Sequence, residues 1–327
     1  MKTIISMIAA GLVAGSALSA VAVVAQDYPT QPITIVVPFS AGGPTDTVTR
    51  LVAAAMSDDL GQQVVVQNVG GAGGTLGAGQ VAAASPDGYT LLLHHIGMST
   101  APALYASLPF DPMTDFAPIG LVTEVPMTIV ARKDFEPATL EDLIAYIKEN
   151  GENITYANAG IGAASQLCGL LLMDELDTKM TEVPYQGTGP AMTDLLGGQI
   201  DMMCDQTTNT TSQIQAGEIK AYAVTTPERI AVLPDLPTLH EGGVDNFNLA
   251  IWHGLYAPAG TDPAIIERLT KSLQTALADS TVGNSFAELG TYPVPADEAT
   301  PQALAAKLEG QIALWGEVVK AAGVSAQ

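Results

Sequence analysis

The chain has 327 residues, and its 34 acidic side chains against 12 Lys and Arg give a formal net charge of −22 at pH 7. This balance argues against a nucleic-acid partner, which requires clustered basic side chains, and it repels an anionic ligand at long range. An anionic ligand would therefore have to be held by local hydrogen-bond donors.

The N-terminal segment, "MKTIISMIAAGLVAGSALSAVAVVAQDYP", has one lysine, a long apolar run and then small residues. This order is typical of a secretory signal peptide, and we expect cleavage after Ala25. An N-terminal membrane anchor is the alternative, because residues 4–25 are almost long enough to span a bilayer. With cleavage, the mature protein of about 300 residues is expected in the periplasm, and it is long enough to form two cores.

The rest of the chain alternates short apolar strands with amphipathic helices, which predicts an α/β fold with parallel strands. The expected strands are residues 33–39, 62–68, 87–95, a segment starting near 127, 153–160, 181–187, 198–206, 219–226 and 249–260. The expected helices are residues 45–56, 75–84, 139–150, 263–278 and 301–322. In the helix at 139–150, Thr139 and Asp142 have the spacing of a capping box.

The alternation starts again near residue 127, which predicts two lobes rather than one. We assign residues 26–128 and 240–327 to domain 1, because the last helices return after the second run, and residues 129–239 to domain 2. Two such lobes leave a crevice between them, and small ligands usually bind in crevices of this kind.

Two glycine-containing loops lie where a predicted strand ends and a helix begins: "PFSAGGPTD" at 38–46 and "ANAGIGAAS" at 157–165. Unpaired N–H groups and the helix dipole make such a position suitable for an anion, and glycine lets a ligand approach the backbone. Each loop taken alone is better explained as a tight turn before a capped helix. One loop in each lobe favours a carboxylate held between them.

Other chemistry finds little support in the motifs. A third glycine run, "VGGAGGTLGAGQ", lacks both the GxGxxG spacing and a Gly-Lys-Ser/Thr motif, so no nucleotide cofactor is expected. Neither GxSxG nor HExxH is present. His94 and His95 are adjacent in a strand and are expected to point to opposite faces. We therefore predict no catalysis, no cofactor and no metal site, with His95 as a ligand contact.

Cys168 and Cys204 are the only cysteines in the sequence. An even number in an exported protein is compatible with a disulfide, and two buried free thiols are the alternative, because sequence gives no distance between them. Neither cysteine has a CxxC partner, so a redox or metal role is not expected.

Five ordered blocks carry a family resemblance: "YPTQPITIVVPFSAGGPTDTVTRLVA", "VVVQNVGGAGGTLGA", "SPDGYTLLL", "LPFDPMTDFAPIGLV" and "VPYQGTGPAMTDLLGGQIDMMCDQTTN". They resemble the periplasmic solute-binding proteins of tripartite tricarboxylate transporters, the Bug family. The resemblance implies a two-domain periplasmic-binding-protein fold of type II with the ligand cleft between the lobes. It also implies a monomer that captures a small carboxylate without catalysis and delivers it to the membrane permease subunits of such a transporter.

The resemblance further implies which residues contact the ligand. The two loops would hold one carboxylate, and residues of the second lobe and the crossing strands would contact the other end. The full set is Phe39, Ser40, Ala41, Gly42, Gly43, Thr45, Asp46, His95, Ser99, Asn158, Ala159, Gly160, Ala163, Ser165, Tyr185, Asp205, Thr207, Thr208 and His253. The cysteine pair and the run "DQTTNTT" are similar to a subgroup that includes binders of aromatic dicarboxylates such as terephthalate. A periplasmic enzyme and a sensory ligand domain are the alternative functions.

Overall fold

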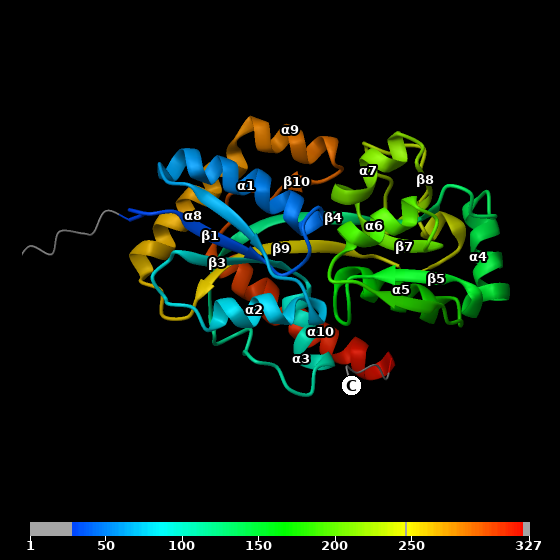
Figure 1. Ribbon diagram of the computed structural model, residues 1–327, viewed down its shortest axis with the longest axis horizontal. Coiled ribbons are helices and arrows are strands. Elements are labelled where there is room, and N and C mark those ends of the chain that lie inside the picture. Colours follow the sequence, from blue (N-terminus) through cyan, green and yellow to red (C-terminus); the bar gives the residue numbers. More distant parts are fainter. Residues whose placement is uncertain (1–27, 246, 323–327) are drawn as a thin grey trace, which may run out of the picture.

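Strand β4 (Phe116–Arg132) runs through both lobes of the molecule and changes its partners on the way (Figure 1). Residues 116–126 pair antiparallel with β9 (Ala250–Pro258), whereas residues 127–132 pair antiparallel with β7 (Met202–Gln206) and β8 (Ile219–Val224). The computed structural model describes residues 28–245 and 247–322, and in it the two groups of strands form two lobes along the long axis. The predicted signal peptide and its cleavage position lie outside the described residues.

The first lobe is a mixed sheet with helices on both faces. Its strands are β1 (Ile33–Val37), β2 (Val64–Asn68), β3 (Thr90–His95), β9, the first part of β4, and β10 (Tyr292–Pro293), in the order β2-β1-β3-β9-β4 with β10 beside β4. Figure 1 shows one face covered by α1 (Pro44–Leu60), α8 (Pro263–Ala278) and α9 (Ser280–Glu288). The other face carries α2 (Thr75–Ala82), α3 (Gly97–Leu104) and α10 (Pro301–Ala322), with the short 3-10 turn η1 (Ala72–Gly74) before α2.

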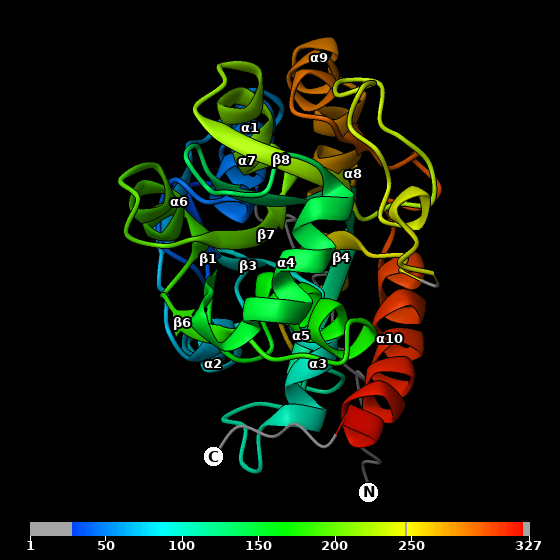
Figure 2. The ribbon, with the colours of Figure 1, turned by 90° about the vertical axis from the view of Figure 1, so that its right-hand side faces the viewer.

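The second lobe continues the sheet beyond β4. The strands β7, β5 (Thr155–Asn158) and β6 (Thr181–Pro184) follow β4 in that order, and β8 also pairs with β4. The helices are α4 (Leu140–Asn150), α5 (Ala164–Glu175), α6 (Thr188–Leu196) and α7 (Thr207–Gln215), with the 3-10 turn η2 (Gly151–Asn153) after α4. A further 3-10 turn, η3 (His240–Gly242), lies in the connection from β8 to β9. Figure 2 looks onto this lobe and shows α10 running along one edge of the molecule.

The expected parallel arrangement holds within each lobe but is wrong for the strands that join them. β1 is parallel to β2 and β3, and β5 is parallel to β6 and β7. β9 is antiparallel to both β3 and β4. The reason is topological: β4 carries the chain out of the first lobe and β9 carries it back, so the two strands must run in opposite directions.

β4 also begins at Phe116, well before the segment expected near residue 127. The part of β4 that pairs with β9 contains Pro118 and Pro126, and its register against β9 shifts between Pro118 and Gly120. Prolines and bulges interrupt the regular alternation by which a strand is recognised in a sequence. The sequence pattern therefore predicts only the part of β4 that follows residue 127.

The predicted helices lack α3, α6, α7 and α9, and α5 is expected only as a helix start after the loop at 157–165. The clearest case is α7, whose sequence "TTNTTSQIQ" is rich in residues of low helix propensity. Its threonines Thr207, Thr208, Thr210 and Thr211 are nevertheless buried, and the Thr210 hydroxyl lies 2.8 Å from that of Thr128 on β4. Burial against β4 therefore overrides the local preference.

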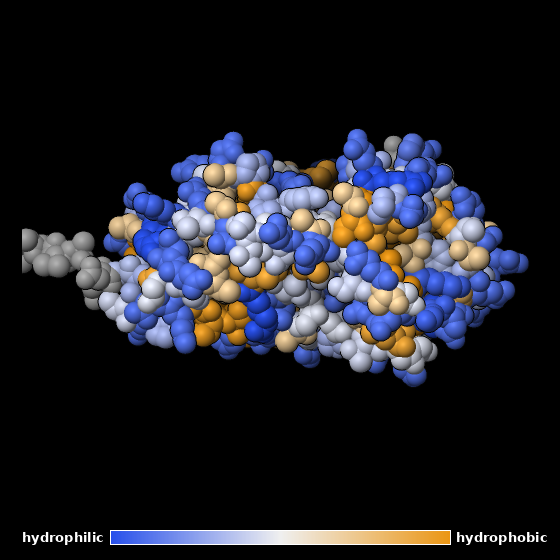
Figure 3. All heavy atoms as spheres, turned by 90° about the horizontal axis from the view of Figure 1, so that it is seen from above, coloured by the Kyte–Doolittle hydropathy of each residue, from blue (hydrophilic) through white to orange (hydrophobic). Residues whose placement is uncertain are grey.

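Apolar cores fill the space between the sheet and its helices. Ile35, Leu93 and Leu273 are fully buried in the first lobe, as are Ile147 and Met202 in the second. The view from above in Figure 3 shows a surface that is mostly hydrophilic or neutral, with smaller hydrophobic areas. Among the described residues, no helix combines the length and the apolar character that a membrane crossing requires.

Candidate functional site

A small cavity lies where the two lobes meet. It is lined by Phe39, Gly43, Pro44, Thr45 and His95 from the first lobe and by Ala159, Ala164, Ser165, Thr188, Asp205 and Gln206 from the second. Its volume is about 20 Å³, close to the least that one water molecule needs. A larger ligand can enter only when the lobes move apart or the surrounding side chains shift.

Four helices of the described chain begin at this cavity. α1 begins at Pro44, α5 at Ala164, α6 at Thr188, and α7 at Thr207, directly after Gln206. The first turn of a helix has unpaired backbone N–H groups and the positive end of the helix dipole. The cavity therefore receives partial positive charge from both lobes, which suits an anion.

The N-termini of these four helices are not capped by side chains. Their N-cap residues, none of which makes a side-chain cap hydrogen bond, are Gly43, Ala163, Gly187 and Gln206. Elsewhere, Thr139 and Asp142 form the predicted capping box of α4, and Asp262 and Asp279 cap α8 and α9. The three capped helices lie away from the cavity, whereas the four helices that begin at it keep their first N–H groups free of a side-chain cap.

The loop before α1 is held by Asp46. Its carboxylate accepts hydrogen bonds from the Gly42 N–H at 2.9 Å, from Arg50 at 2.9 Å and from Asn68 at 3.0 Å. Burial by itself would raise the pKa of Asp46, but the hydrogen bonds from Arg50, Gly42 and Asn68 together lower it. Gly42 has a φ of +78°, which favours glycine. Asp46 thus fixes the loop, and it does not line the cavity.

The loop before α5 is braced by its own side chains. The Asn158 side-chain oxygen accepts from the Gly160 N–H at 2.9 Å, and the Ser165 hydroxyl accepts from the Ala159 N–H at 2.9 Å. The Asn158 amide donates to Glu182 at 2.8 Å. Asn158 therefore shapes the loop from behind, while Ala159 and Ser165 line the cavity.

The expectation that His94 and His95 point to opposite faces is wrong. Both rings are buried, their centroids are 5.0 Å apart, and both lie against Phe39. The reason is that His95 ends β3 and the backbone turns into α3 directly after it, so strand alternation no longer applies. Among the described residues, no group of three or more His, Cys, Asp and Glu could hold a metal ion.

The buried histidines supply no positive charge at neutral pH. Burial lowers the pKa of His94 to about 3, with a further contribution from His253, and burial lowers the pKa of His253 to about 3. Burial also lowers the pKa of His95 well below its usual value. His253 lies behind the cavity wall, with Nε2 3.4 Å from the Thr45 hydroxyl. The histidines at the cavity therefore meet an anion as neutral groups.

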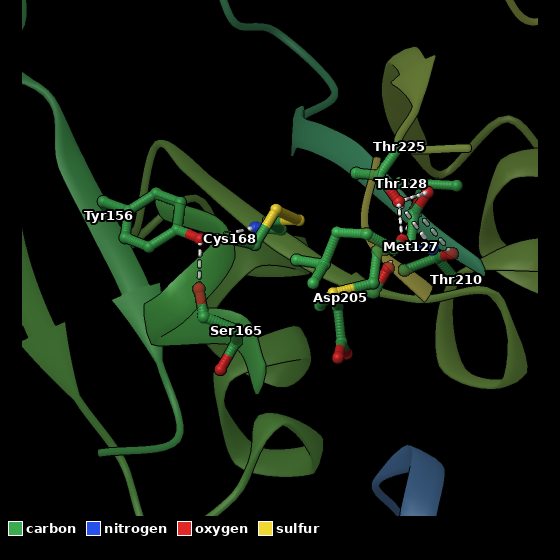
Figure 4. Close-up of a disulfide and its surroundings, with 10 residues drawn as sticks. Met127, Thr128, Tyr156, Ser165, Cys168, Asp205, Thr210 and Thr225 are labelled. Atoms are coloured by element: carbon green, nitrogen blue, oxygen red, sulfur yellow. Dashed lines mark hydrogen bonds between the residues drawn. A yellow bond between two sulfur atoms is a disulfide. The ribbon is translucent and has the colours of Figure 1, made fainter. Parts of the chain in front are cut away.

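Among the described residues, Asp205 is the only acidic one that lines the cavity. It is 1 % exposed, its carboxylate accepts a hydrogen bond from Asn209 at 2.6 Å, and burial raises its pKa to about 6. Figure 4 shows the carboxylate pointing away from Thr128 and Thr210. A buried carboxylate is unexpected in a site that otherwise suits an anion.

The structure brings only some of the predicted ligand contacts to the cavity. The predicted residues that line it are Phe39, Gly43, Thr45, His95, Ala159, Ser165 and Asp205. Those that do not are Ser40, Ala41, Gly42, Asp46, Ser99, Asn158, Gly160, Ala163, Tyr185, Thr207, Thr208 and His253. Several of the latter bond elsewhere: Tyr185 donates to Asp194 at 2.6 Å, Ser99 to the Ile96 carbonyl at 2.7 Å, and Thr207 to the Gly290 carbonyl at 3.3 Å.

Four lining residues are absent from the predicted set: Pro44, Ala164, Thr188 and Gln206. Thr188 stands between two glycines in "QGTGP", directly after a predicted strand, which is the same pattern that identified the other two loops. That signal was available in the sequence. Gln206 lies within the predicted strand at 198–206, and no feature of the sequence indicates that its side chain faces the other lobe.

Glycines line the contact between the lobes. A Cβ atom placed on Gly189 would lie 2.6 Å from the Ala41 carbonyl oxygen, and one on Gly187 would lie 2.7 Å from the Ser40 nitrogen. The third glycine run contributes in the same way, because a Cβ on Gly73 would overlap the Ile161 carbonyl. We call this set of close approaches the glycine seam. It explains a glycine run for which no nucleotide motif was found.

Hydrogen bonds also cross the seam. The Ser40 N–H donates to the Gln186 carbonyl at 2.9 Å, and the Thr100 hydroxyl donates to the Gly162 carbonyl at 2.9 Å. The Tyr105 hydroxyl lies 2.8 Å from the Ala72 carbonyl of the first lobe and 2.9 Å from the Ile161 carbonyl of the second. The arrangement described is therefore a closed one, in which backbone atoms and the hydroxyls of Thr100 and Tyr105 connect the lobes.

Cys168 of α5 and Cys204 of β7 form a disulfide, with Cα atoms 6.1 Å apart (Figure 4). Both cysteines are fully buried. Next to them, the Tyr156 hydroxyl donates to the Ser165 carbonyl at 2.5 Å and accepts from the Cys204 N–H at 3.3 Å. The disulfide thus ties the helix that carries Ser165 to the strand that carries Asp205.

Comparison with known proteins gives consistent matches along the chain. The family described as Tripartite tricarboxylate transporter family receptor matches residues 48–324. A UPF0065 protein of Agrobacterium vitis, from the TAR-I ttuE-ttuC' intergenic region, is 58% identical over 300 residues, covering 91% of this chain and 87% of the relative. Protein BugT of Bordetella pertussis is 34% identical over 318 residues, covering 96% of each chain.

Solved structures agree. The periplasmic binding protein BugD has a TM-score of 0.90 at 53% identity, covering 92% of this chain and 100% of its own. The MatC protein of Rhodopseudomonas palustris with bound malate has a TM-score of 0.86 at 41% identity, covering 89% and 100%. A further R. palustris protein, solved with adipate, has a TM-score of 0.86 at 32% identity, covering 91% and 99%. The chain therefore has the two-lobe fold of periplasmic binding proteins and belongs to the receptor family of tripartite tricarboxylate transporters, whose members bind solutes without catalysis.

Proposed function

We propose that this chain is a periplasmic receptor that binds a small carboxylate in the cavity between its lobes and delivers it to a membrane permease of the tripartite tricarboxylate type. The observation that carries the proposal is that four uncapped helix N-termini, from both lobes, meet at one cavity. Their N–H groups and dipoles attract a carboxylate at short range, although the net charge of −22 repels it at long range.

The ligand class follows from the donors and is supported by the relatives. The described residues of the cavity lining include hydroxyl donors in Thr45 and Ser165, while the Thr188 hydroxyl bonds to Asp205, and they include no Lys or Arg. Relatives solved with malate and with adipate both hold a dicarboxylate. We place one carboxylate between the loops at 38–46 and 157–165. Tricarboxylates and aromatic dicarboxylates such as terephthalate are tested as members of the same class.

Binding is coupled to closure of the lobes. Each lobe provides part of the lining, so the closed state is favoured only when a ligand bridges both parts. We assign residues 26–128 and 240–327 to one lobe and residues 129–239 to the other, in keeping with the change of partners along β4. Opening would then bend β4 near Met127 and β9 near Ala250, where the pairing between these two strands ends.

We also propose that the protein is exported by signal-peptide cleavage and binds the permease subunits of its transporter. Cleavage after Ala25 would release a monomeric receptor into the periplasm, and N-terminal sequencing of the protein from a periplasmic extract checks that position. Co-purification with the permease subunits in the presence of ligand checks the partner. A species that keeps its first 25 residues would contradict export by cleavage.

The deciding experiment is thermal unfolding of the refolded protein against malate, adipate, citrate and terephthalate, with the matching methyl esters as uncharged controls. A ligand that binds only the folded state stabilises it by RT ln(1 + [L]/Kd), or about 2.7 kcal/mol at a hundredfold excess over Kd. We expect at least one free acid to raise the midpoint and its ester to leave it unchanged. If no acid shifts the midpoint, or if the esters act equally well, the carboxylate site is wrong.

A further inference from the structure

The second lobe presents acceptors to the cavity as well as donors. Asp205 and Gln206 are adjacent at the end of β7, both line the cavity, and they are only 1 % and 2 % exposed. Within the described residues, the side-chain oxygen Oε1 of Gln206 has no hydrogen-bond partner. A buried acceptor without a partner destabilises the protein, because it has lost its hydrogen bonds to water and forms none in their place.

Asp205 has donors but no positive charge near it. Asn209 donates to its Oδ2 at 2.6 Å, and the Thr188 hydroxyl and the Gln206 N–H also hydrogen-bond to the carboxylate. No ion pair of the described residues includes Asp205. The carboxylate is therefore a buried negative charge whose partners in the protein are all neutral.

The other titratable groups around Asp205 do not supply that charge. His95 lines the cavity and His253 lies behind Thr45, and burial holds the pKa of both well below neutrality. Tyr156 on β5 stays protonated, because burial raises its pKa. On α1, Asp46 and Arg50 are paired with each other. On α6, Asp194 accepts from Tyr185.

A dicarboxylate without a donor group would face the negative charge of Asp205 and the lone pairs of Gln206 Oε1, and it could bond to neither. Repulsion between a ligand carboxylate and Asp205 is strong where water is excluded, and Gln206 would keep its unpaired oxygen. A ligand that carries a hydrogen-bond donor beside its carboxylate removes both costs, since the donor can bond to the Asp205 carboxylate and to Gln206 Oε1.

We propose that Asp205 and Gln206 select the ligand by accepting a hydrogen bond from it, so that this receptor prefers a small carboxylate with a hydroxyl or ammonium group over the same carboxylate without one. This inference rests on the proposed function, because it assigns the acceptor part of the same site. Asp205 is the specificity-determining residue, and the helix N-termini bind the carboxylate common to all ligands.

The test compares matched acids that differ at one carbon. Succinate, malate and aspartate carry hydrogen, hydroxyl and ammonium at that carbon, and the six-carbon set is adipate with its 2-hydroxy and 2-amino derivatives. The set is chosen by the chain length that binds best in the thermal panel. Titration calorimetry at pH 7.5 is expected to give at least tenfold tighter binding for the hydroxy or amino acid than for the unsubstituted one. Whichever of the two binds more tightly identifies the group.

The Asp205→Asn variant is expected to shrink that preference to less than threefold, with tighter binding of the unsubstituted acid. Asp194→Asn makes the same change outside the cavity and should keep the wild-type preference. Lowering the pH to 5 protonates Asp205, whose pKa is about 6, so the preference of the wild type for an ammonium group should fall there by more than that of Asp205→Asn, whose change reports only the protonation of the acids themselves.

Equal binding of all three acids by the wild type would overturn the inference, as would tightest binding of a dicarboxylate that carries no donor. The same preference in Asp205→Asn as in the wild type would also overturn it. These outcomes leave the carboxylate receptor intact, whereas absence of binding by every acid in the panel overturns the proposed function itself.

Discussion

The buried carboxylate of Asp205 lowers the stability of the folded state at neutral pH. Burial raises its pKa from the usual 3.8 to about 6. Below about pH 4 the carboxyl is protonated in both the folded and the unfolded chain. Between pH 4 and pH 6 the unfolded chain loses the proton first, so the folded state becomes less stable by about 3 kcal/mol, and the loss is complete above pH 6.

The Asp205→Asn variant should therefore be more stable than the wild type at pH 8, by up to about 3 kcal/mol, and equally stable at pH 4. The asparagine keeps an oxygen for the Asn209 hydrogen bond but has no charge to bury. Urea unfolding of both proteins at the two pH values measures the difference, and all other titrating groups cancel between them. A difference that does not change with pH would contradict the buried-charge explanation.

The disulfide should contribute measurably to the stability of the fold. Cys168 and Cys204 are 36 residues apart, and a loop of this length stabilises the fold by roughly 4 kcal/mol in the chain-entropy model. We expect the double variant Cys168→Ala, Cys204→Ala to lose stability of this order and to bind ligand more weakly, because Ser165 and Asp205 are no longer tied together. Urea unfolding and calorimetry check the two effects.

Reductant provides the control for that comparison. It should lower the urea midpoint of the wild type towards that of the double variant and leave the variant unchanged. If reductant leaves the wild type unchanged under conditions that unfold it, the two thiols are not bonded in solution.

At the level of elements, the glycine seam forms only when the two lobes close on each other. A Cβ on Gly189 would lie 2.6 Å from the Ala41 carbonyl of the other lobe, although the backbone of Gly189 is helical and unstrained within its own lobe. Gly189→Ala should weaken ligand binding at least tenfold while leaving the stability without ligand nearly unchanged. Calorimetry measures the first effect and thermal unfolding the second.

Gly310→Ala in α10 is the matched control. A Cβ at this position would meet no heavy atom within 4 Å, and alanine has a higher helix propensity, so we expect a gain of about 1 kcal/mol and unchanged binding. A bulky residue at Gly43, whose Cβ would face the Gly189 nitrogen at 3.4 Å, should weaken all ligands alike. Unchanged affinity in both Gly189→Ala and the Gly43 variant would rule out the seam as a condition for binding.

The helices also show which elements are readable in a sequence. The bounds predicted for α8 and α10 are those found, and α4 carries the predicted capping box, because amphipathic periodicity and caps are local signals. The threonine-rich α7 and the proline-containing first half of β4 are not readable in this way. Their structure depends on the neighbours that bury them.

For the whole molecule, the net charge of −22 predicts an unusual dependence on salt. Repulsion slows the approach of an anionic ligand at low ionic strength, and salt screens it as the Debye length falls from about 30 Å at 0.01 M to about 8 Å at 0.15 M. We expect the association rate of a dicarboxylate to rise several-fold over this range. Stopped-flow measurement of intrinsic tryptophan fluorescence can follow it.

A monocarboxylate of the same length is the control, and its rate should rise by a smaller factor because it carries less charge. A rate that falls as salt is added would mean that the entrance attracts anions despite the overall charge. The helix N-termini would then act beyond the cavity itself.

The sequence by itself determined the alternation of strands and helices, the two-lobe organisation and the two loops at which α1 and α5 begin, since each depends on residues close together in the chain. Only the tertiary structure decided that β4 and β9 run antiparallel between the lobes, that Asp46, Asn158 and Tyr185 brace the surrounding loops, and that Thr188 and Gln206 join the lining. The physical reason is that a side chain's role depends on which distant backbone it meets when the lobes close. The local pattern of residues does not contain that information.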